Sequence, residues 1–389
     1  MRINILIYAY EPTLGEMGGV RKLLELGKSF VRLGHQVTVF VPDFIDVEEP
    51  TLEVVTYRTV PAPLLRPVSA YLRMSKAVRR RARDAPPHIV YARTSRDILP
   101  ALTARWLGAR FLFEVNGDAF GEQGWSHGIF RALSILCADW VNSRLASGVV
   151  AITPGLARMV EHRYGIDPTK VCCIPSGTSV DHVKPSDTEV CRRELGLESK
   201  QPVLVFLGVL YAHQGVITLL KAMAEVLRAK PDAVLLVVGD GPARADLEAS
   251  AASLGIGDAV TFTGSVPYEE IPRYLGAATC CVAPFAASRG ETSPLKLFDY
   301  MAAGRATVAT LIPAVEDLVG ASEAIVAVPP DDAPRMAEAI LGLLQEPQRC
   351  RTLGDSGRGY VVRHHGWDQI AGRILAECVE RERETVHPR

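Results

Sequence analysis

The chain of 389 residues lacks the features that mark a membrane-spanning, secreted or nucleic-acid-binding protein. No apolar run approaches the roughly 18 residues that a membrane-spanning helix needs. The first apolar run, residues 3–10, is soon followed by Glu11 and Pro12, which is unlike a signal peptide. The formal net charge of −1 gives no overall attraction to nucleic acid, so no such partner is expected. We therefore expect a cytoplasmic protein whose charged sites are local.

Patterns that bind metals or form disulfides are also missing. The eight cysteines include no Cys-x-x-Cys pair, and two adjacent doublets, 172–173 and 280–281, lie inside apolar runs. Such residues are typical of small core side chains in a reducing compartment. The chain has no Asp-x-Asp motif. Neither a disulfide nor a metal site is therefore predicted.

A regular alternation of short β-branched apolar runs and amphipathic stretches runs from end to end of the chain. This alternation is typical of parallel sheets covered by helices, so the predicted fold class is α/β. At 48% hydrophobic residues, the chain is long enough to fill two cores. Strands are predicted at residues 3–10, 36–41, 53–57, 88–91, 110–113, 148–152 and 171–174, and then at 203–207, 233–238, 259–262, 279–283, 306–309 and 324–327.

Two facing Rossmann-like domains are the simplest interpretation of this order. The boundary is predicted in the polar, proline-marked passage between residues 180 and 201, which gives domains of residues 1–182 and 183–366. Residues 367–389 have a helical period and a charged end, and a return of this helix to the first domain is one arrangement. Ligands of such sheets bind at the carboxyl ends of the strands, so a cleft there is expected.

The most informative segment is 290–304, which reads GETSPLKLFDYMAAG. Ser293 is predicted to cap a helix with its hydroxyl, Pro294 to take the first helical position and Gly304 to take the left-handed exit. A helix start has unpaired N–H groups and the positive end of the helix dipole, which suit a phosphate. Glu291 and Asp299 add carboxylates that can bind hydroxyl groups. This segment predicts a site for a phosphorylated sugar ligand.

Two further glycine-rich loops follow predicted strands. Gly18 and Gly19 precede a predicted helix at 20–33, and 239–242, Gly-Asp-Gly-Pro, precedes another. Glycines at a helix start let the backbone approach a ligand closely, although glycine pairs are also common in simple turns.

Together these residues resemble the GT-B glycosyltransferases of family 4. The resemblance rests on 239–242, on Gly-Ser-Val at 264–266, on Glu291 and Asp299 with seven residues between them, and on Ala-Ala-Gly at 302–304. Gly18-Gly19 and Ile-Pro-Ser-Gly at 174–177 fall where that family has its N-terminal glycine loop and an I-P-N-G-like segment. The likeness runs over essentially the whole chain.

The resemblance implies retaining transfer of a sugar from a nucleotide-diphosphate sugar, UDP- or GDP-linked, without a cofactor or metal. The C-terminal domain would bind the donor, and the N-terminal domain would bind a glycan, lipid-linked or small-molecule acceptor. Asp299 matches the family's second glutamate and should bind the ribose hydroxyls, unless it forms only a surface ion pair with Lys296. Glu291 matches the first glutamate and should contact the donor sugar. The other donor-binding candidates are Gly18, Gly19, Gly208, His213, Gln214, Gly239, Gly241, Ser265, Val266, Thr292, Ser293, Pro294 and Leu295.

The chain departs from the family at two places that carry chemistry. Val209 and Gln214 stand where many members have an arginine and a lysine, and Lys296 is the nearest cation that can replace them at a diphosphate. Asn116 stands where many members have a histidine, and an amide cannot act as a general base. The catalytic candidates are therefore Glu291, Lys296, Asn116 and Asp118, with Glu122 and His127 as further acids or bases in that loop.

One local concentration of positive charge lies at residues 71–83, where no clean apolar stripe is evident. It is either a solvated domain face or a peripheral contact with the inner face of a membrane. The residues for such a contact are Arg73, Lys76, Arg79, Arg80 and Arg81. Arg93 and Arg96 follow a predicted strand and, with Glu122, are the acceptor-binding candidates.

Two other functions fit the same pattern. The missing cations favour a catalytically silent GT-B protein that binds a nucleotide or glycan. A GT-B sugar-nucleotide epimerase or a phosphorylase would use the same architecture, and the products formed without an acceptor distinguish these from a transferase.

Overall fold

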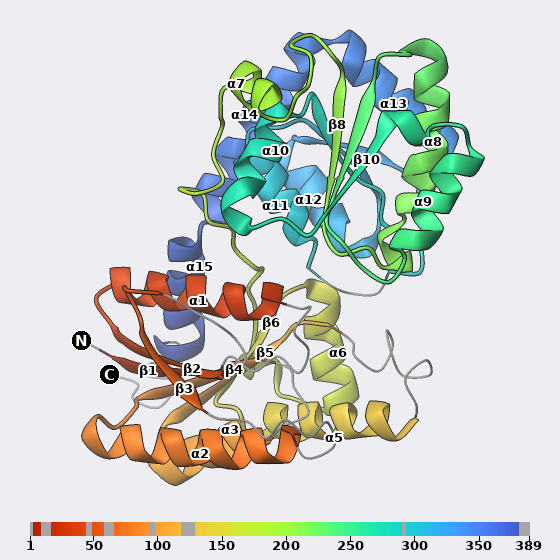
Figure 1. Cartoon of the computed structure of the whole chain (residues 1–389). Coiled ribbons are helices and arrows are strands. Elements are labelled where there is room, and N and C mark those ends of the chain that lie inside the picture. Colours follow the sequence, from red (N-terminus) through yellow and green to blue (C-terminus); the bar gives the residue numbers. More distant parts are fainter. Residues whose placement is uncertain are drawn as a thin grey trace. The chain divides into compact units, whose positions relative to one another are not determined.

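The computed structural model describes residues 3–8, 17–43, 49–57, 66–93, 98–117, 129–289 and 293–380. They form two compact units (Figure 1). The first unit comprises Met1–Ser176, Gly290–Ser293 and Trp367–Arg389, and the second comprises Gly177–Arg289 and Pro294–Gly366. Six of the predicted site residues lie outside the described residues, namely Arg96, Asp118, Glu122, His127, Glu291 and Thr292.

The first unit contains a sheet of seven strands, all parallel where they pair. In order across the sheet they are β3 (Glu53–Tyr57), β2 (Gln36–Pro42), β1 (Asn4–Tyr8), β4 (Ile89–Arg93), β5 (Arg110–Val115), β6 (Gly148–Ala151) and β7 (Val171–Cys173). The order turns back between β1 and β4, so the switch point of the sheet lies between these two strands.

Helices cover both faces of this sheet, and the strands alternate their side chains between them. Ile5 and Ile7 of β1 pack in one core with α1 (Met17–Arg32) and α15 (Trp367–Leu375), which continues as a π-helical turn, Ala376–Glu380. Leu6 and Tyr8 pack in the other core. The helices on that side are α2 (Arg66–Asp84), α3 (Leu99–Leu107) and α6 (Pro154–Tyr164), with α5 (Ile129–Leu145) beside α6 (Figure 1).

The second unit contains a parallel sheet of six strands. Across the sheet they are β10 (Val260–Gly264), β9 (Val234–Val238), β8 (Val203–Leu207), β11 (Cys280–Ala283), β12 (Thr307–Thr310) and β13 (Ile325–Val328). Here the order turns back at β8, so the switch point lies between β8 and β11.

Two buried clusters flank this second sheet. One holds α8 (Val216–Ala229), α9 (Arg244–Ser253) and α13 (Ala333–Gln345) against Leu204 and Phe206 of β8. The other holds α10 (Ile271–Ala277), α11 (Leu295–Ala302), α12 (Pro313–Ser322) and α14 (Pro347–His364) against Val203 and Val205. The helix α7 (Thr188–Glu194) contacts α10.

The α/β fold class predicted from the sequence is confirmed. Each predicted strand is present, with ends that differ by one or two residues where they differ at all, and the predicted end of the first strand at residue 10 lies outside the described residues. The helix predicted at 20–33 is α1, which begins at Met17 and includes Gly18 and Gly19 in its first turn. Apolar residues recur every second position in strands and about every 3.6 positions in helices, because each element buries one face. These periods therefore predict where strands and helices lie.

The chain leaves the first unit at Ser176 rather than at residue 182. The reason is local, since the segment after Ser176 bonds to helices of the second unit. Thr178 bonds to α11, and the guanidinium of Arg358 in α14 donates to the carbonyls of Val180, Val183 and Ala302 at 2.9, 3.0 and 2.9 Å. Residues 367–380 belong with the first unit, where α15 packs on α1.

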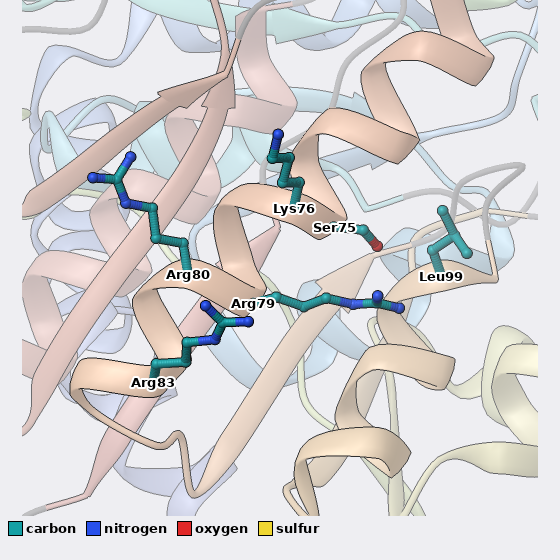
Figure 2. Close-up of a pocket in the computed structure, with 6 residues that line it drawn as sticks. All are labelled: Ser75, Lys76, Arg79, Arg80, Arg83 and Leu99. Carbon is teal, nitrogen blue, oxygen red and sulfur yellow. The ribbon is translucent and has the colours of Figure 1, made fainter.

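Two expectations about individual side chains were wrong. The α2 segment does carry an apolar stripe, because Met74, Val78 and Ala82, at every fourth position, are buried. Arg81 does not belong to the exposed basic surface, since it forms a two-point ion pair with Glu53 at 2.6 and 2.7 Å. The cations that remain exposed on α2 are Arg73, Lys76, Arg79, Arg80 and Arg83, and Figure 2 shows the last four.

The cysteines are free thiols, and five of the eight are buried as expected. Cys137 on α5 is exposed and is an exception to the prediction of core cysteines.

Candidate functional site

The predicted donor-binding residues of the second unit gather at the carboxyl ends of β8, β9 and β10. The helix α11 reaches the same edge because the hydroxyl of Tyr300 bridges two strands. It accepts from the N–H of Leu207 at the end of β8 at 2.8 Å and donates to the carbonyl of Val282 in β11 at 3.3 Å. The start of α11 is thereby fixed at the switch point, where ligands of open parallel sheets bind.

The glycines of these loops are required by neighbouring backbone. The N–H of Gly208 donates to Val238 O at 2.9 Å, and that of Gly239 donates to Gly264 O at 3.0 Å. A Cβ at Gly239 would lie 2.1 Å from Gly208 O, and a Cβ at Gly241 would lie 2.6 Å from the N of Leu210. Side chains at these positions would force the strand ends apart. Close packing of the loops on one another therefore explains both glycines before any ligand is considered.

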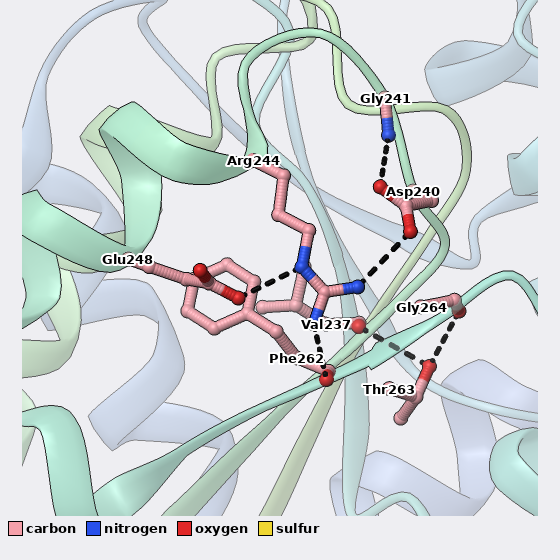
Figure 3. Close-up of polar contacts among 8 residues, drawn as sticks. All are labelled: Val237, Asp240, Gly241, Arg244, Glu248, Phe262, Thr263 and Gly264. Atoms are coloured by element: carbon pink, nitrogen blue, oxygen red, sulfur yellow. Dashed lines mark hydrogen bonds and ion pairs between the residues drawn. The ribbon is translucent and has the colours of Figure 1, made fainter.

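The loop that joins β9 to α9 is held by Arg244 (Figure 3). Its guanidinium pairs with Asp240 at 3.0 Å and with Glu248 at 2.8 Å, and donates to Phe262 O at 3.3 Å. A hydrogen bond from the N–H of Gly241 and then the charge-assisted bond from Arg244 lower the pKa of Asp240. Ser265 is exposed and Val266 is half-buried just beyond β10, beside this braced loop.

Lys296, in the first turn of α11, places its ammonium group against the backbone at the end of β8. A Cβ at Gly208 would lie 3.0 Å from Nζ, which donates to Gln214 Oε1 at 2.7 Å and lies 3.8 Å from the ring centroid of Phe206. Burial lowers the pKa of Lys296 well below its ordinary value, and the positive charge of Arg289 lowers it further. The acceptor oxygen of Gln214, predicted to serve the donor, is engaged by Lys296.

Arg289 and His213 share this electrostatic environment. The guanidinium of Arg289 lies 4.3 Å from the ring centroid of Phe285. The imidazole of His213 stacks on the ring of Tyr211, with the two ring centroids 5.4 Å apart. Burial lowers the pKa of His213, and the charges of Arg289 and Lys296 lower it further. The edge of the sheet thus carries the guanidinium of Arg289 in addition to Lys296, and Arg289 was not among the residues predicted from the sequence.

Asp299 lies one helical turn after Lys296. Its Oδ1 accepts a hydrogen bond of 2.5 Å from the hydroxyl of Thr178. The ring of the neighbouring Phe298 stacks on the imidazole of His365, with ring centroids 4.2 Å apart. The backbone N–H of Thr178 donates to His365 O at 2.8 Å. The segment around His365 therefore holds both Thr178 and the helix that carries Asp299 in place. The carboxylate is held in one orientation, as hydroxyl recognition requires.

The helix start was predicted one residue too early. α11 begins at Leu295 with Pro294 as its N-cap, and no side chain caps it. Pro294 has ψ of 54°, outside the helical range, so the first helical residue is Leu295. Leu295 is 39% exposed at this end. The left-handed exit at Gly304, with φ of +66°, agrees with the prediction.

In the first unit, the predicted residues Arg93 and Asn116 meet above a buried ion pair. Lys22 Nζ lies 2.6 Å from Glu114 Oε1 and donates to Ser176 Oγ at 2.9 Å, while the hydroxyl of Tyr91 donates to Glu114 Oε2 at 2.6 Å. With the amide of Asn116 oriented to suit its neighbours, its NH₂ donates to Glu114 Oε1 and its oxygen accepts from Arg93 Nε at 2.8 Å.

Several residues with these contacts were not predicted from the sequence. Arg289 directly precedes the 290–304 segment, and this adjacency was an available signal. Thr178 directly follows Ile-Pro-Ser-Gly, which was another. Lys22 and Glu114 are separated by 92 residues in the chain and carry no local signal of their contact.

Two kinds of feature are absent from the described residues. No cluster of three or more His, Cys, Asp or Glu side chains in that part of the chain is arranged as a metal site. None of its helices has the length and apolarity to cross a bilayer.

Family profiles match both units of the chain. The profile described as "Glycosyltransferase Family 4" matches residues 17–182, and the one described as "Glycosyl transferases group 1" matches residues 201–346. The chain belongs to glycosyltransferase family 4. Three relatives of this family 4 chain illustrate its range.

The D-inositol 3-phosphate glycosyltransferase of Segniliparus rotundus is 32% identical over 232 residues, which are 59% of this chain and 51% of the relative. The chain thus matches about half the length of that relative. The alpha-D-kanosaminyltransferase of Streptomyces kanamyceticus is 29% identical over 70% of this chain and 72% of its own. A GDP-mannose-dependent alpha-(1-6)-phosphatidylinositol monomannoside mannosyltransferase of Mycolicibacterium smegmatis is 26% identical over 94% of this chain and 96% of its own.

Solved structures show the same fold. Sucrose-phosphate synthase from Thermosynechococcus elongatus superposes with a TM-score of 0.79 at 21% identity, covering 99% of this chain and all of that one. HepE from Anabaena, in complex with UDP-glucose, superposes with a TM-score of 0.76 at 18% identity, covering 96% of this chain and 99% of that one. The two sheets of this family 4 chain therefore have the GT-B fold predicted from its sequence.

Proposed function

We propose that this protein is a retaining glycosyltransferase that moves a sugar from a nucleotide-diphosphate sugar to a hydroxyl group of an acceptor. The observation that carries the proposal is the position of Lys296. Its ammonium lies against Gly208 at the switch point of the second sheet, one helical turn from the oriented carboxylate of Asp299. A cation beside a fixed carboxylate suits a diphosphate attached to a ribose.

Lys296 and Arg289 take the part that an arginine and a lysine after β8 play in the family resemblance. The diphosphate gains negative charge as the bond to the sugar breaks, and preorganised cations stabilise that charge. Lys296 is half-buried, so its ammonium interacts more strongly with an anion than it would in bulk water. These cations supply the charge that a divalent metal would otherwise supply, and on this ground we propose a metal-independent reaction.

The proposed step needs no protein nucleophile. The acceptor oxygen bonds to the anomeric carbon on the face that the diphosphate leaves, while the bond from that carbon to the diphosphate oxygen breaks. The acceptor proton passes to that same diphosphate oxygen. The anomeric configuration is retained, and Glu291 and Lys296 position the donor and stabilise charge.

The identity of the donor is the next part of the proposal. The relatives named above include an enzyme described as GDP-mannose-dependent, and the HepE structure contains UDP-glucose. We propose a UDP- or GDP-linked donor and a glycan, a lipid-linked sugar or a small polyol as acceptor. No cofactor beyond this co-substrate is proposed.

The test is slow hydrolysis of donor in the absence of acceptor. Purified protein is incubated with UDP-glucose, UDP-N-acetylglucosamine and GDP-mannose, and free nucleotide is measured over hours. Release from one donor, lost in Lys296→Met but not in the surface variant Arg335→Met, supports a transferase. Binding of a donor without any release supports the silent binding protein. A new sugar nucleotide without acceptor identifies an epimerase, and phosphate-dependent release of a sugar phosphate identifies a phosphorylase.

A peripheral membrane contact is the remaining part of the proposed function. Lys76, Arg79, Arg80 and Arg83 are exposed on one face of α2, here called the basic ridge, and with Ser75 and Leu99 they line a cavity of about 570 Å³ (Figure 2). Among the described residues, none of these four side chains has an ion pair or hydrogen-bond partner. The guanidinium of Arg79 lies 5.0 Å from the ring centroid of Trp106.

The neighbouring helix adds apolar anchors to the basic ridge. Leu102 and Trp106, one turn apart on α3, are 42% and 58% exposed. Exposed tryptophan beside basic residues suits the interface of an anionic bilayer. Each Lys or Arg near such a surface contributes about 1 kcal/mol, so removal of the four should weaken binding by more than about 100-fold.

Flotation with vesicles that contain 30% phosphatidylglycerol tests this contact. The quadruple change of the basic ridge to glutamine should abolish flotation, whereas Arg335→Gln, Arg349→Gln and Arg351→Gln on other exposed helices should leave it intact. Equal flotation of both variants would contradict the proposed contact, and so would an equal amount of wild-type protein on vesicles of phosphatidylcholine alone.

A further inference from the structure

We propose that Lys22, Tyr91 and Glu114 form a buried network that positions Arg93, through Asn116, to bind an anionic group of the acceptor. This inference rests on the proposed function, because it assigns the acceptor side of that reaction. The ligand class is an acceptor that bears a phosphate or a carboxylate.

The first argument is the cost of the network. Lys22 is 8% exposed and Glu114 is 2% exposed, and both oxygens of the carboxylate are engaged. Buried ion pairs give little net stability over an apolar core, because the loss of hydration offsets their attraction. An apolar pair of the same volume would fold as well. The network therefore suggests a role in placing other groups.

The second argument is the direction in which the contacts run. Oε1 of Glu114 accepts from Lys22 Nζ at 2.6 Å and from the amide of Asn116. This orients the amide so that its oxygen accepts from Arg93 Nε at 2.8 Å. Because a guanidinium is planar, a fixed Nε sets the plane in which its terminal nitrogens lie. Asn116, unable to act as a base, has a positioning role here.

The third argument is the place of Arg93 in the sheet. It is the last residue of β4, and the switch point of the first sheet lies between β4 and β1. Crevices at such points bind the ligands of open parallel sheets. The N-terminal part of α1 lies at the same edge of this unit, and Lys22 in its second turn reaches Glu114.

The fourth argument is charge. Burial disfavours ionisation of Glu114, but the charges of Lys22 and Arg93 and the hydrogen bonds to the carboxylate outweigh it, so its pKa is lowered. Burial and the charge of Glu114 raise the pKa of Tyr91 well above its ordinary value, so it stays a hydrogen-bond donor. One carboxylate thus faces two cations, Lys22 and Arg93. Burial lowers the pKa of Lys22, so the charge available to an anion is that of Arg93, whose guanidinium binds phosphate or carboxylate at two points.

The test follows the side-chain Nε–H signal of Arg93 by NMR in protein labelled with ¹⁵N-arginine, assigned by its loss in Arg93→Lys. Inorganic phosphate is titrated with saturating UDP present, so that the donor edge is already occupied. The signal should shift with phosphate and reach saturation in the millimolar range. Glu114→Gln should weaken that affinity at least fivefold while UDP affinity stays within twofold of wild type. Acetate in place of phosphate tells whether the site prefers phosphate or carboxylate.

A wild-type Arg93 signal that does not respond to either anion overturns the anion site. Equal anion affinity in folded Glu114→Gln and wild type overturns the positioning role. If Glu114→Gln does not fold, Tyr91→Phe removes a single hydrogen bond to the same carboxylate, and a loss of about twofold or more in anion affinity is required of it. UDP binding and donor hydrolysis are measured on the same samples, and their failure alone would count against the proposed function rather than against this site.

Discussion

The hydroxyl of Thr178 donates a hydrogen bond of 2.5 Å to Oδ1 of Asp299, across 121 residues of sequence. This contact links the segment that follows Ile-Pro-Ser-Gly to the carboxylate assigned to the ribose. It also engages one oxygen of the Asp299 carboxylate within the protein. The carboxylate is therefore oriented before a ligand arrives, which reduces the entropy lost on binding.

Asp299→Ala should weaken nucleotide binding. Charge-assisted hydrogen bonds are worth about 1.5–3 kcal/mol, so a loss of roughly 10- to 100-fold in affinity is expected. Isothermal calorimetry with UDP and GDP measures it. Unchanged affinity in a variant with unchanged melting temperature would refute the ribose assignment.

Thr178→Val separates orientation from contact, since valine keeps the shape and removes the hydroxyl. The expected loss in nucleotide affinity is smaller, about 3- to 10-fold, because the carboxylate remains but is no longer held. Ser179→Ala on the adjacent residue is the control. A loss as large as that of Asp299→Ala would mean that Thr178 contacts the ligand itself.

Lys296→Met should reduce turnover more than binding. Removing one preorganised group at a developing charge costs about 100-fold or more in kcat. Donor hydrolysis and transfer rates measure it, with Arg335→Met as the control, since Arg335 forms only an exposed pair with Glu338. A kcat within threefold of wild type would remove Lys296 from the reaction.

Nucleotide binding should take up protons. Burial and Arg289 hold the pKa of Lys296 well below its ordinary value in the unliganded protein, and a bound diphosphate favours the charged form and raises it. Affinity should therefore fall as pH rises through the window between the two pKa values, by at most about tenfold per unit. Calorimetry in buffers of different ionisation enthalpy counts the protons, and Lys296→Met should abolish the uptake.

The sign for stability is opposite to that for binding. A lysine with a lowered pKa in the folded state binds fewer protons folded than unfolded between that pKa and its ordinary value near 10.5. The unliganded protein should therefore gain stability from Lys296 as pH rises through this window. Comparison of melting temperatures with Lys296→Met isolates the effect.

Two glycines in helices should respond to alanine in opposite directions. A Cβ at Gly354 in α14 would lie 2.1 Å from Gly304 O, so Gly354→Ala must push α14 away from the turn after α11, at a cost of about 1–3 kcal/mol. A Cβ at Gly342 in α13 meets nothing within 4 Å, and Gly342→Ala should stabilise by about 0.5–1 kcal/mol. Urea unfolding measures both. A destabilised Gly342→Ala would contradict the helical account.

The parts of the fold that sequence predicted are those in which local pattern and burial agree. The run 203–207 became β8 because all its residues are apolar and both faces of its sheet are covered. The start of α11 was missed by one residue because Pro294 has ψ of 54° and so stays outside the helix, whereas at α6 the same kind of pair, Thr153 before Pro154, does form a cap with proline in the first helical position.

The site was predicted where its residues share a segment. Lys296 and Asp299 lie one turn apart, and the motif that contains them is continuous. The network of Lys22, Tyr91 and Glu114 joins α1, β4 and β5, and its contacts exist only when the sheet has formed. Pairing of residues so far apart depends on tertiary packing, which no local period encodes. The same holds for Thr178 and Asp299.

The boundary between Ser176 and Gly177 limits the distance between two hydroxyl-bearing residues, Ser176 and Thr178. Ser176 accepts from Lys22 of the first unit, and Thr178 donates to Asp299 of the second. An extended chain advances at most about 3.6 Å per residue, so the Cα atoms of Ser176 and Thr178 stay within roughly 7 Å of each other under any motion. One glycine therefore separates a hydroxyl that is bonded within the first unit from a hydroxyl that is bonded within the second.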